Sequence, residues 1–181
     1  MSSFPEAQIV ADRLDIREFG PADAGLVREL LSAGEPEALP PGAPAQPSGL
    51  DVWLADGVHQ VRHGGGGVHL MMLDRAHAKI VGAIGVFHTD WEVRSAEIGY
   101  GVRGGERGRG YATEALAAVS RWVLTEGGMQ RAWLTANVDN VASVRVAEKA
   151  GFHREGTLRR VALEDGILHD QAVFSLLDDE I

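Results

Sequence analysis

The residues with the clearest potential for chemistry lie between Val102 and Glu114, in a stretch that holds four glycines and three arginines. Glycine lets a backbone approach a ligand closely, and the first amide groups of a helix have no partners within the helix. A helical hydrophobic pattern begins at Tyr111, and Arg107 and Arg109 add positive charge in front of it. The stretch therefore predicts an anion site suited to a diphosphate. The alternative is an ordinary glycine-rich turn with solvated arginines.

Two common phosphate-binding motifs do not fit this stretch. A dinucleotide fingerprint would need a third small glycine where Thr113 stands. A P-loop would need a Gly-Lys-Ser/Thr sequence, which does not follow. An anion site of another kind remains.

The composition is that of a globular protein with an excess of acidic residues. The chain has 181 residues, of which 45% are hydrophobic, and its 17 Lys and Arg against 26 Asp and Glu give a net charge of −9. This charge argues against a nucleic-acid partner but permits a local basic site. The absence of cysteine excludes disulfides, thiolate metal sites and cysteine nucleophiles. With no long apolar run and no signal pattern at the N-terminus, we expect a cytoplasmic protein without a membrane partner.

The hydrophobic pattern predicts the elements that must position the glycine-rich stretch. Strands are predicted at residues 13–17, 68–73, 80–87, 96–102, 132–135 and 152–158, and helices from residue 21, at 52–61, at 111–126 and at 141–149. Asp165-Gly166 predicts a hairpin between strands at 160–163 and 172–177. Five of the seven prolines lie at 35–49, which predicts a mobile loop. The order indicates a single α/β domain over residues 1–181, with helices on the faces of a mixed sheet.

Two motifs carry a resemblance to a known family. Arg107-Gly108-Arg109-Gly110-Tyr111-Ala112 is similar to the Q/R-x-x-G-x-G/A motif of the GNAT superfamily, the CoA-dependent N-acyltransferases. Thr113-Glu114-Ala115-Leu116 resembles the continuation found in its ribosomal-protein N-acetyltransferase (RimJ/RimL-like) branch. Downstream, residues 137–143 resemble the N-x-x-N-x-x-S segment of that branch, and Gly151-Phe152 its next strand start. The resemblance extends over residues 10–178.

The resemblance implies a fold and a co-substrate. The fold is a GNAT fold, with a mixed, twisted, mostly antiparallel sheet that is splayed between its fourth and fifth strands, here 96–102 and 132–135, and flanked by helices. Acetyl-CoA would lie in this split, pairing with the exposed strand edge as an added strand would. The residues that the resemblance assigns to acetyl-CoA are Val102, Arg107, Gly108, Arg109, Gly110, Tyr111, Ala112, Thr113, Asn137, Asn140 and Ser143.

Acetyl transfer to an amine needs a base for the amine and a proton for the leaving thiolate. Glu97 stands on the strand that leads into the glycine-rich stretch, where members of the family often place a catalytic glutamate that acts directly or through water. The hydroxyl of Ser143, or bulk water, would protonate the thiolate, because Tyr100 and Tyr111 do not occupy the position beyond the second motif where many members carry a tyrosine. The alternatives are a structural glutamate at position 97 and helix capping by Asn140 and Ser143.

The acceptor is predicted to contact His88 and Trp91, before strand 96–102, and Trp53 on the second helix, although either tryptophan could be a core residue. The branch implies a protein N-terminal amine as acceptor. A small amine, such as an antibiotic, a polyamine or a metabolite, is the alternative, and a non-catalytic acyl-CoA-binding domain is a third hypothesis. No histidine spacing typical of a metal site is present, so no metal is expected. The resemblance also leaves a homodimer open.

Overall fold

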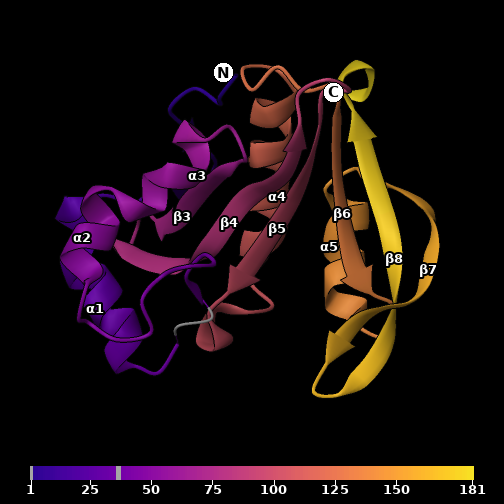
Figure 1. The fold of residues 1–181 in the computed structure, drawn as a ribbon. Helices are drawn as coiled ribbons and strands as arrows, with labels where there is room; N and C mark the ends of the chain where they lie inside the picture. The colour runs from indigo at the N-terminus through magenta and orange to yellow at the C-terminus, as the bar shows by residue number, and fades with distance from the viewer. Residues whose placement is uncertain (1, 36–37) are drawn as a thin grey trace.

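An eight-stranded sheet runs through the computed structural model, which describes residues 2–35 and 38–181 (Figure 1). In order across the sheet, the strands are β1 (Gln8–Val10), β2 (Leu14–Glu18), β3 (Val68–Asp74), β4 (Lys79–Asp90), β5 (Ser95–Val102), β6 (Arg131–Asn137), β8 (Ile167–Leu177) and β7 (His153–Glu164). Neighbouring strands are antiparallel except β5 and β6, which are parallel. The prediction of a mixed, mostly antiparallel sheet is confirmed.

The pairing between β5 and β6 is short. It joins Ser95–Glu97 of β5 only to Arg131–Trp133 of β6. Beyond Glu97 the two strands separate, and in Figure 1 β6 and β8 lean away from β5. The expected splay at this place in the sheet is therefore confirmed, and it leaves a strand edge of β5 open toward its C-terminal end.

Helices cover the two faces of the sheet and create two core clusters. The helical segments are η1 (Pro21–Asp23), α1 (Ala24–Ser32), α2 (Leu50–Ala55), η3 (Gly57–His59), α3 (Gln60–His63), η4 (Gly104–Glu106), α4 (Tyr111–Leu124), α5 (Val141–Lys149) and η5 (Asp178–Glu180). On one face, α4 packs Leu116 and Val119 into the larger cluster. On the other, α1 and α2 pack Leu30 and Leu54 into the smaller one. Alternation along the strands supplies both clusters from one sheet.

The structure corrects several predicted elements. The predicted helix at 52–61 is divided, because the backbone of Asp56 leaves the helical conformation (φ −140°) and a new turn starts at Gly57. The strands predicted at 152–158 and 160–163 form the single strand β7, whose irregular register absorbs the residues between them. The three residues of β1 were not predicted, since so short a strand shows no clear alternation. The hairpin turn at Asp165-Gly166 is confirmed, with φ values of +50° and +79°.

The proline-rich segment forms turns and bends rather than regular elements over residues 38–49, as expected. Ala38 and Leu39 are nevertheless buried in the cluster under α1 and α2. This packing does not fit the expectation of a loop that is mobile over its whole length. Pro36 lies outside the described residues.

A buried polar contact fixes the start of α4. The hydroxyl of Tyr111, the first residue of α4, donates a hydrogen bond of 2.7 Å to Oδ2 of Asp74 at the end of β3. This hydrogen bond lowers the pKa of Asp74 to about 2, although burial alone would raise it. A second contact, between Nδ1 of His77 and Oδ2 of Asp74 at 2.9 Å, also lowers this pKa. The carboxylate therefore stays charged inside the protein and holds the helix start against the sheet.

Arg13, just before β2, holds the same helix start from the other side. Its guanidinium lies 4.6 Å from the ring centre of Tyr111 and its Nη2 lies 2.7 Å from Oε2 of Glu114. Its Nη1 also donates to the carbonyl of Arg109 at 2.9 Å. Contacts within the protein thus hold the glycine-rich stretch and α4 against β2 and β3.

Tyr111→Phe should lower the free energy of unfolding at pH 7 by about 2 kcal/mol, because a buried carboxylate loses its main hydrogen bond. The pKa of Asp74 should rise from about 2 toward its ordinary value. A carboxyl group with a depressed pKa contributes its full stability above the unfolded value of ~3.9 and loses it as the pH falls through the folded value. The difference between the wild type and the variant should therefore shrink from pH ~4 toward pH ~2.

Chemical denaturation at several pH values and an NMR titration of Asp74 measure both effects. Tyr100→Phe is the matched control, because the hydroxyl of Tyr100 faces a backbone carbonyl rather than a carboxylate. A loss in Tyr111→Phe that stays constant with pH would contradict the assignment.

Candidate active site

A cleft of about 610 Å³ opens where β5 and β6 separate. Its walls come from the end of β5, the glycine-rich stretch, the start of α4 and the exposed face of α5. Nine of the eleven residues predicted for acetyl-CoA line it: Val102, Arg107, Gly108, Gly110, Tyr111, Ala112, Thr113, Asn140 and Ser143. Arg109 and Asn137 are not among the lining residues. Tyr100, Gly101, Glu106, Ala142, Arg145, Val146 and Lys149, which the sequence did not single out for this site, also line it.

The glycine-rich stretch reaches α4 through two left-handed backbone positions. Gly108 has φ +75° and Gly110, the residue before α4, has φ +82°. Residues with a Cβ rarely adopt this conformation, which explains glycine at both positions. No side chain caps the start of α4. Its first amide groups are therefore available to an anion in the cleft.

Glu106, the acidic residue that lines the cleft, pairs with two cations that lie outside the lining. Glu106 is largely buried, and its carboxylate contacts Nζ of Lys79 at 2.6 Å and Nη1 of Arg109 at 3.2 Å. The hydrogen bond from Lys79 lowers the pKa of Glu106, so this carboxylate is ionised despite its burial. Nε of Arg107 donates to the carbonyl of Val102 at 3.1 Å. A ligand that pairs with this carbonyl would compete with the guanidinium of Arg107 for it.

Tyr100 connects the two walls of the cleft. Its hydroxyl donates to the backbone carbonyl of Ser143 at 3.5 Å, from β5 to α5. Burial raises the pKa of Tyr100, so the hydroxyl keeps its proton at neutral pH. The sequence did not predict Tyr100 as a proton donor, because this tyrosine lies before the second motif. Its neighbour in space is 43 residues away along the chain, and only the folded sheet shows their proximity.

Asn140 and Asn137 are both engaged in local contacts. Oδ1 of Asn140 accepts a hydrogen bond from the amide of Ser143 at 3.1 Å, so Asn140 caps α5. Helix capping was the alternative to ligand contact for Asn140. Contact of Asn140 with a ligand stays a prediction. Oδ1 of Asn137 accepts from Gln171 of β8 at 3.2 Å.

Glu97 is the last residue of β5 that pairs with β6. Its neighbours Ala96 and Ile98 are buried against the α4 side of the sheet, so the side chain of Glu97 points to the opposite face. Its Oε2 lies 2.6 Å from Nδ1 of His88. The side chain of His88 is 77% exposed, whereas that of Glu97 is 20% exposed. The structure thus brings together two predicted residues at the point where the sheet opens.

The two tryptophans predicted to contact an acceptor have packing roles. Trp91 donates from Nε1 to the carbonyl of Gly65 at 2.7 Å, and its ring lies 5.0 Å from that of Phe4. Trp53 is only 9% exposed and packs on Phe19. Contact with an acceptor stays a prediction for both, and the burial of Trp53 argues against it.

An aromatic surface that the sequence did not reveal lies on the same face as Glu97. The ring of Phe87, the strand partner of Glu97, covers Gly85 and Gly99, where an added Cβ would lie 2.6 Å and 3.2 Å from ring atoms. His69 lies beside it, with ring centres 5.5 Å apart. Burial lowers the pKa of His69, so its imidazole is neutral at pH 7. Glycines inside a strand pattern were the available signal, because they mark close approach of another group.

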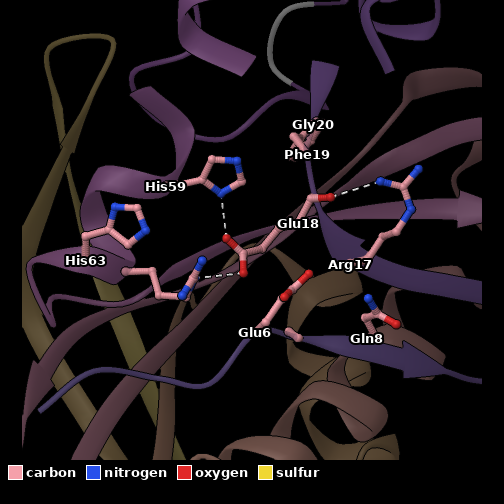
Figure 2. A pocket seen from close by; sticks show the side chains of 10 residues that line it. Glu6, Gln8, Arg17, Glu18, Phe19, Gly20, His59 and His63 are labelled. Carbon is pink, nitrogen blue, oxygen red and sulfur yellow. Dashed lines mark hydrogen bonds and ion pairs between the residues drawn. The ribbon is translucent and has the colours of Figure 1, made fainter. Parts of the chain in front are cut away.

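A second cavity of about 400 Å³ lies near β1 and β2, beside η3 and α3 (Figure 2). In it the buried carboxylate of Glu18 contacts Nδ1 of His59 at 2.7 Å and Nε of Arg62 at 2.8 Å. Arg17 is paired with Asp23 at 2.6 Å. Because these charges are matched within the protein, the cluster fastens η3 and α3 to the end of β2 rather than offering a free charge to a ligand.

Within residues 2–35 and 38–181, no group of three or more His, Asp or Glu side chains is arranged to hold a metal ion. Across the same described ranges, every helix is too short or too polar to cross a membrane.

Comparison with curated proteins finds relatives that carry acetyltransferase names. The probable N-acetyltransferase YjcK of Bacillus subtilis (strain 168) is 30% identical over 115 residues, which are 62% of this chain and 64% of YjcK. The ribosomal-protein-serine acetyltransferase of Escherichia coli (strain K12) is 26% identical over 120 residues, which are 61% of this chain and 67% of that protein. The chain thus spans less than two thirds of the length of YjcK.

Solved structures show the same fold over nearly the whole chain. RimJ of Mycobacterium smegmatis, in complex with CoA-disulfide, has a TM-score of 0.79 at 22% identity and covers 100% of this chain and 92% of its own. A spermidine N-acetyltransferase chimera from Vibrio cholerae has a TM-score of 0.71 at 19% identity and covers 93% of this chain and 97% of its own. At these identities the likeness concerns the fold alone.

A family model described as an acetyltransferase (GNAT) domain matches residues 13–153, well over half of the sequence, and spans both the glycine-rich stretch and the strands that open the cleft. The chain therefore belongs to the GNAT acetyltransferase family.

Proposed function

We propose that this protein transfers an acetyl group from acetyl-CoA to a primary amine. An anion site and a carboxylate along one open strand edge support this proposal. The glycine-rich anion site follows Val102, and Glu97 stands five residues earlier on β5. At about 3.3 Å per residue in a strand, the two are separated by roughly 17 Å. An extended pantetheine arm that starts at a diphosphate covers such a distance.

The residues of the cleft suit the shape and charge of CoA. The free amide groups at the start of α4 would hold the pyrophosphate, with Gly108 and Gly110 giving close access to the backbone. The open edge of β5 at Val102 would pair with the pantetheine amides once Arg107 has moved away. Bound there, acetyl-CoA would supply an activated acetyl thioester.

Other residues would serve the transfer itself. Glu97, at the end of the strand pairing, would provide the negative charge that removes a proton from the amine, directly or through another group. The protonated hydroxyl of Tyr100 and that of Ser143 both line the cleft and would supply the proton for the thiolate. Loss of this machinery would leave a non-catalytic acyl-CoA-binding domain, and the intact pairing of Glu97 with His88 argues against that hypothesis.

The acceptor we favour is a protein N-terminal α-amine, in the cytoplasm. The name of the Escherichia coli relative, a ribosomal-protein-serine acetyltransferase, supports this choice. The alternative is a small cationic amine. The likeness to a spermidine N-acetyltransferase and the ring of Phe87 beside Glu97 support it, since aromatic faces attract cations. The acidic excess of the chain suits either acceptor.

The panel that tests the function contains acetyl-CoA with synthetic peptides that begin with free serine or alanine, and with spermidine. We expect release of free thiol that depends on a peptide acceptor. Glu97→Gln should lower kcat by about 10²-fold or more, the scale of acid–base catalysis, with the Kd for CoA unchanged. Thiol release only with spermidine would select the small-amine alternative. Tight CoA binding without thiol release on any acceptor would contradict the proposed activity.

Gly110→Ala tests the anion site. Alanine at φ +82° is strained by about 1–2 kcal/mol, and its Cβ would lie 3.4 Å from Nη2 of Arg13. The backbone should shift to relieve the strain, so that the amides of α4 lose their aim and the Kd for CoA rises about tenfold. Isothermal titration calorimetry measures this change.

Gly166→Ala is the matched control for this experiment. Gly166 has a similar φ of +79°, and a Cβ there would meet nothing within 4 Å, but it lies in the hairpin turn between β7 and β8. Its affinity for CoA should equal that of the wild type. An equal loss in both variants would show that general strain, not the anion site, is responsible.

A further inference from the structure

We infer that His88 is the residue that takes the proton from the acceptor amine, and that Glu97 acts through it as a positioning residue. This inference rests on the proposed acetyl transfer. Nδ1 of His88 lies 2.6 Å from Oε2 of Glu97, at the end of the pairing between β5 and β6. The two residues thus form a carboxylate–imidazole pair at the point where β5 and β6 separate, outside the residues that line the cleft.

The backbone is deformed at the place that allows this contact. Phe87 pairs with Glu97 in the regular register of β4 and β5, and its side chain lies on the same face. The next residue of a regular strand would point to the opposite face. Instead, the register shifts between Phe87 and Asp90, and His88 adopts a left-handed φ of +44°. The irregularity therefore turns the imidazole back toward Glu97, which is what a bulge beside an active site can do.

The deformed segment is fastened to its surroundings. The hydroxyl of Thr89 donates to the carbonyl of Gly66 at 3.1 Å, and Nε1 of Trp91 donates to that of Gly65 at 2.7 Å. Gly67 packs directly on β4, since a Cβ there would overlap the carbonyl oxygen of Val86. These contacts hold the strained residue in place, and they give Trp91 a role in the site without contact to the acceptor.

The two members of the pair differ in their access to solvent. The side chain of His88 is 77% exposed and that of Glu97 is 20% exposed. An ionised carboxylate only accepts hydrogen bonds, so the neutral imidazole carries its proton on Nδ1 and presents a free lone pair on Nε2. His88 can meet an incoming amine and later release a proton to water. Glu97 orients the ring and stabilises the imidazolium.

The acceptor amine loses two protons during the transfer. The acceptor enters as an ammonium ion and gives one proton to Nε2 of His88. The neutral nitrogen then attacks the thioester carbonyl, a C–N bond forms, and the C–S bond breaks with departure of the thiolate. The nitrogen of the new amide loses a second proton, which ends on the thiolate and yields the free thiol of CoA. His88 returns the first proton to solvent.

His88→Ala distinguishes this role from direct catalysis by Glu97. With the most active acceptor of the panel, kcat should fall at least tenfold while the Kd for CoA is unchanged. Added imidazole should restore part of the activity in proportion to its concentration, because it replaces the missing base. A purely structural role of His88 would show no such rescue. Wild-type kcat in His88→Ala, or a loss that imidazole leaves unchanged, would overturn the inference.

His153→Ala is the matched control. His153, the first residue of β7, is also exposed, and its Nε2 lies 3.4 Å from Oε1 of Glu180. It does not line the cleft. The variant should keep wild-type kcat and show no response to imidazole. A second readout needs no acceptor amine: the ¹⁵N chemical shifts of His88 in the free protein should report a proton on Nδ1, and Glu97→Leu, which leaves no oxygen to accept that proton, should remove this preference. A proton on Nε2 in the wild type would overturn the inference. If the wild type acetylates no amine, both the proposed function and the role of His88 are wrong. If the wild type is active and His88→Ala is equally active, only the role of His88 is wrong.

Discussion

The early end of the pairing between β5 and β6 is the constraint on which the rest of the site depends. A backbone edge inside a sheet normally finds its partners in the next strand, because unpaired buried amides and carbonyls are costly. Here the partners stop at Glu97 and Trp133. The remaining edge of β5 is accessible only because the antiparallel unit of β6, β8 and β7 leans away from it (Figure 1). One departure from regular pairing thus gives both an open strand edge and a carboxylate at its inner end.

An open edge needs a rigid frame, and buried polar contacts supply it at the other end of the cleft. Asp74 and Tyr111 join β3 to α4, and Arg13 adds β2 to the same point. The carboxylate of Asp74 and the hydroxyl of Tyr111 would each be costly to bury alone, so their contact is specific as well as stabilising. The amides at the start of α4 therefore keep one direction. This fixed direction matters because the proposed anion site would consist of backbone groups, whose position follows the position of the helix.

The sequence was sufficient for the features that depend on local pattern. The helical spacing after Tyr111 and the glycines before it predicted the start of α4 at the right residue, while the anion site stays a prediction. The sequence pattern could not predict contacts between segments that are far apart along the chain. The neighbours of Tyr100 and Phe87 depend on strand register, and the irregularity at His88 follows no residue pattern. The division of the predicted helix at Asp56 is different, because it directly precedes Gly57, a residue of low helix propensity.

Arg107 connects the open edge of β5 to the proposed anion site. Its guanidinium covers the carbonyl of Val102, while Glu106 occupies Lys79 and Arg109. A partly exposed hydrogen bond of this kind contributes only about 1 kcal/mol, so an arriving strand-like ligand can replace it at that carbonyl. The released guanidinium is then next to the amides of α4, where a diphosphate would gain a charge-assisted partner. Under the proposed binding of CoA, the same side chain would contact the strand edge before binding and the diphosphate after it, which would link the two halves of the cleft to one binding event.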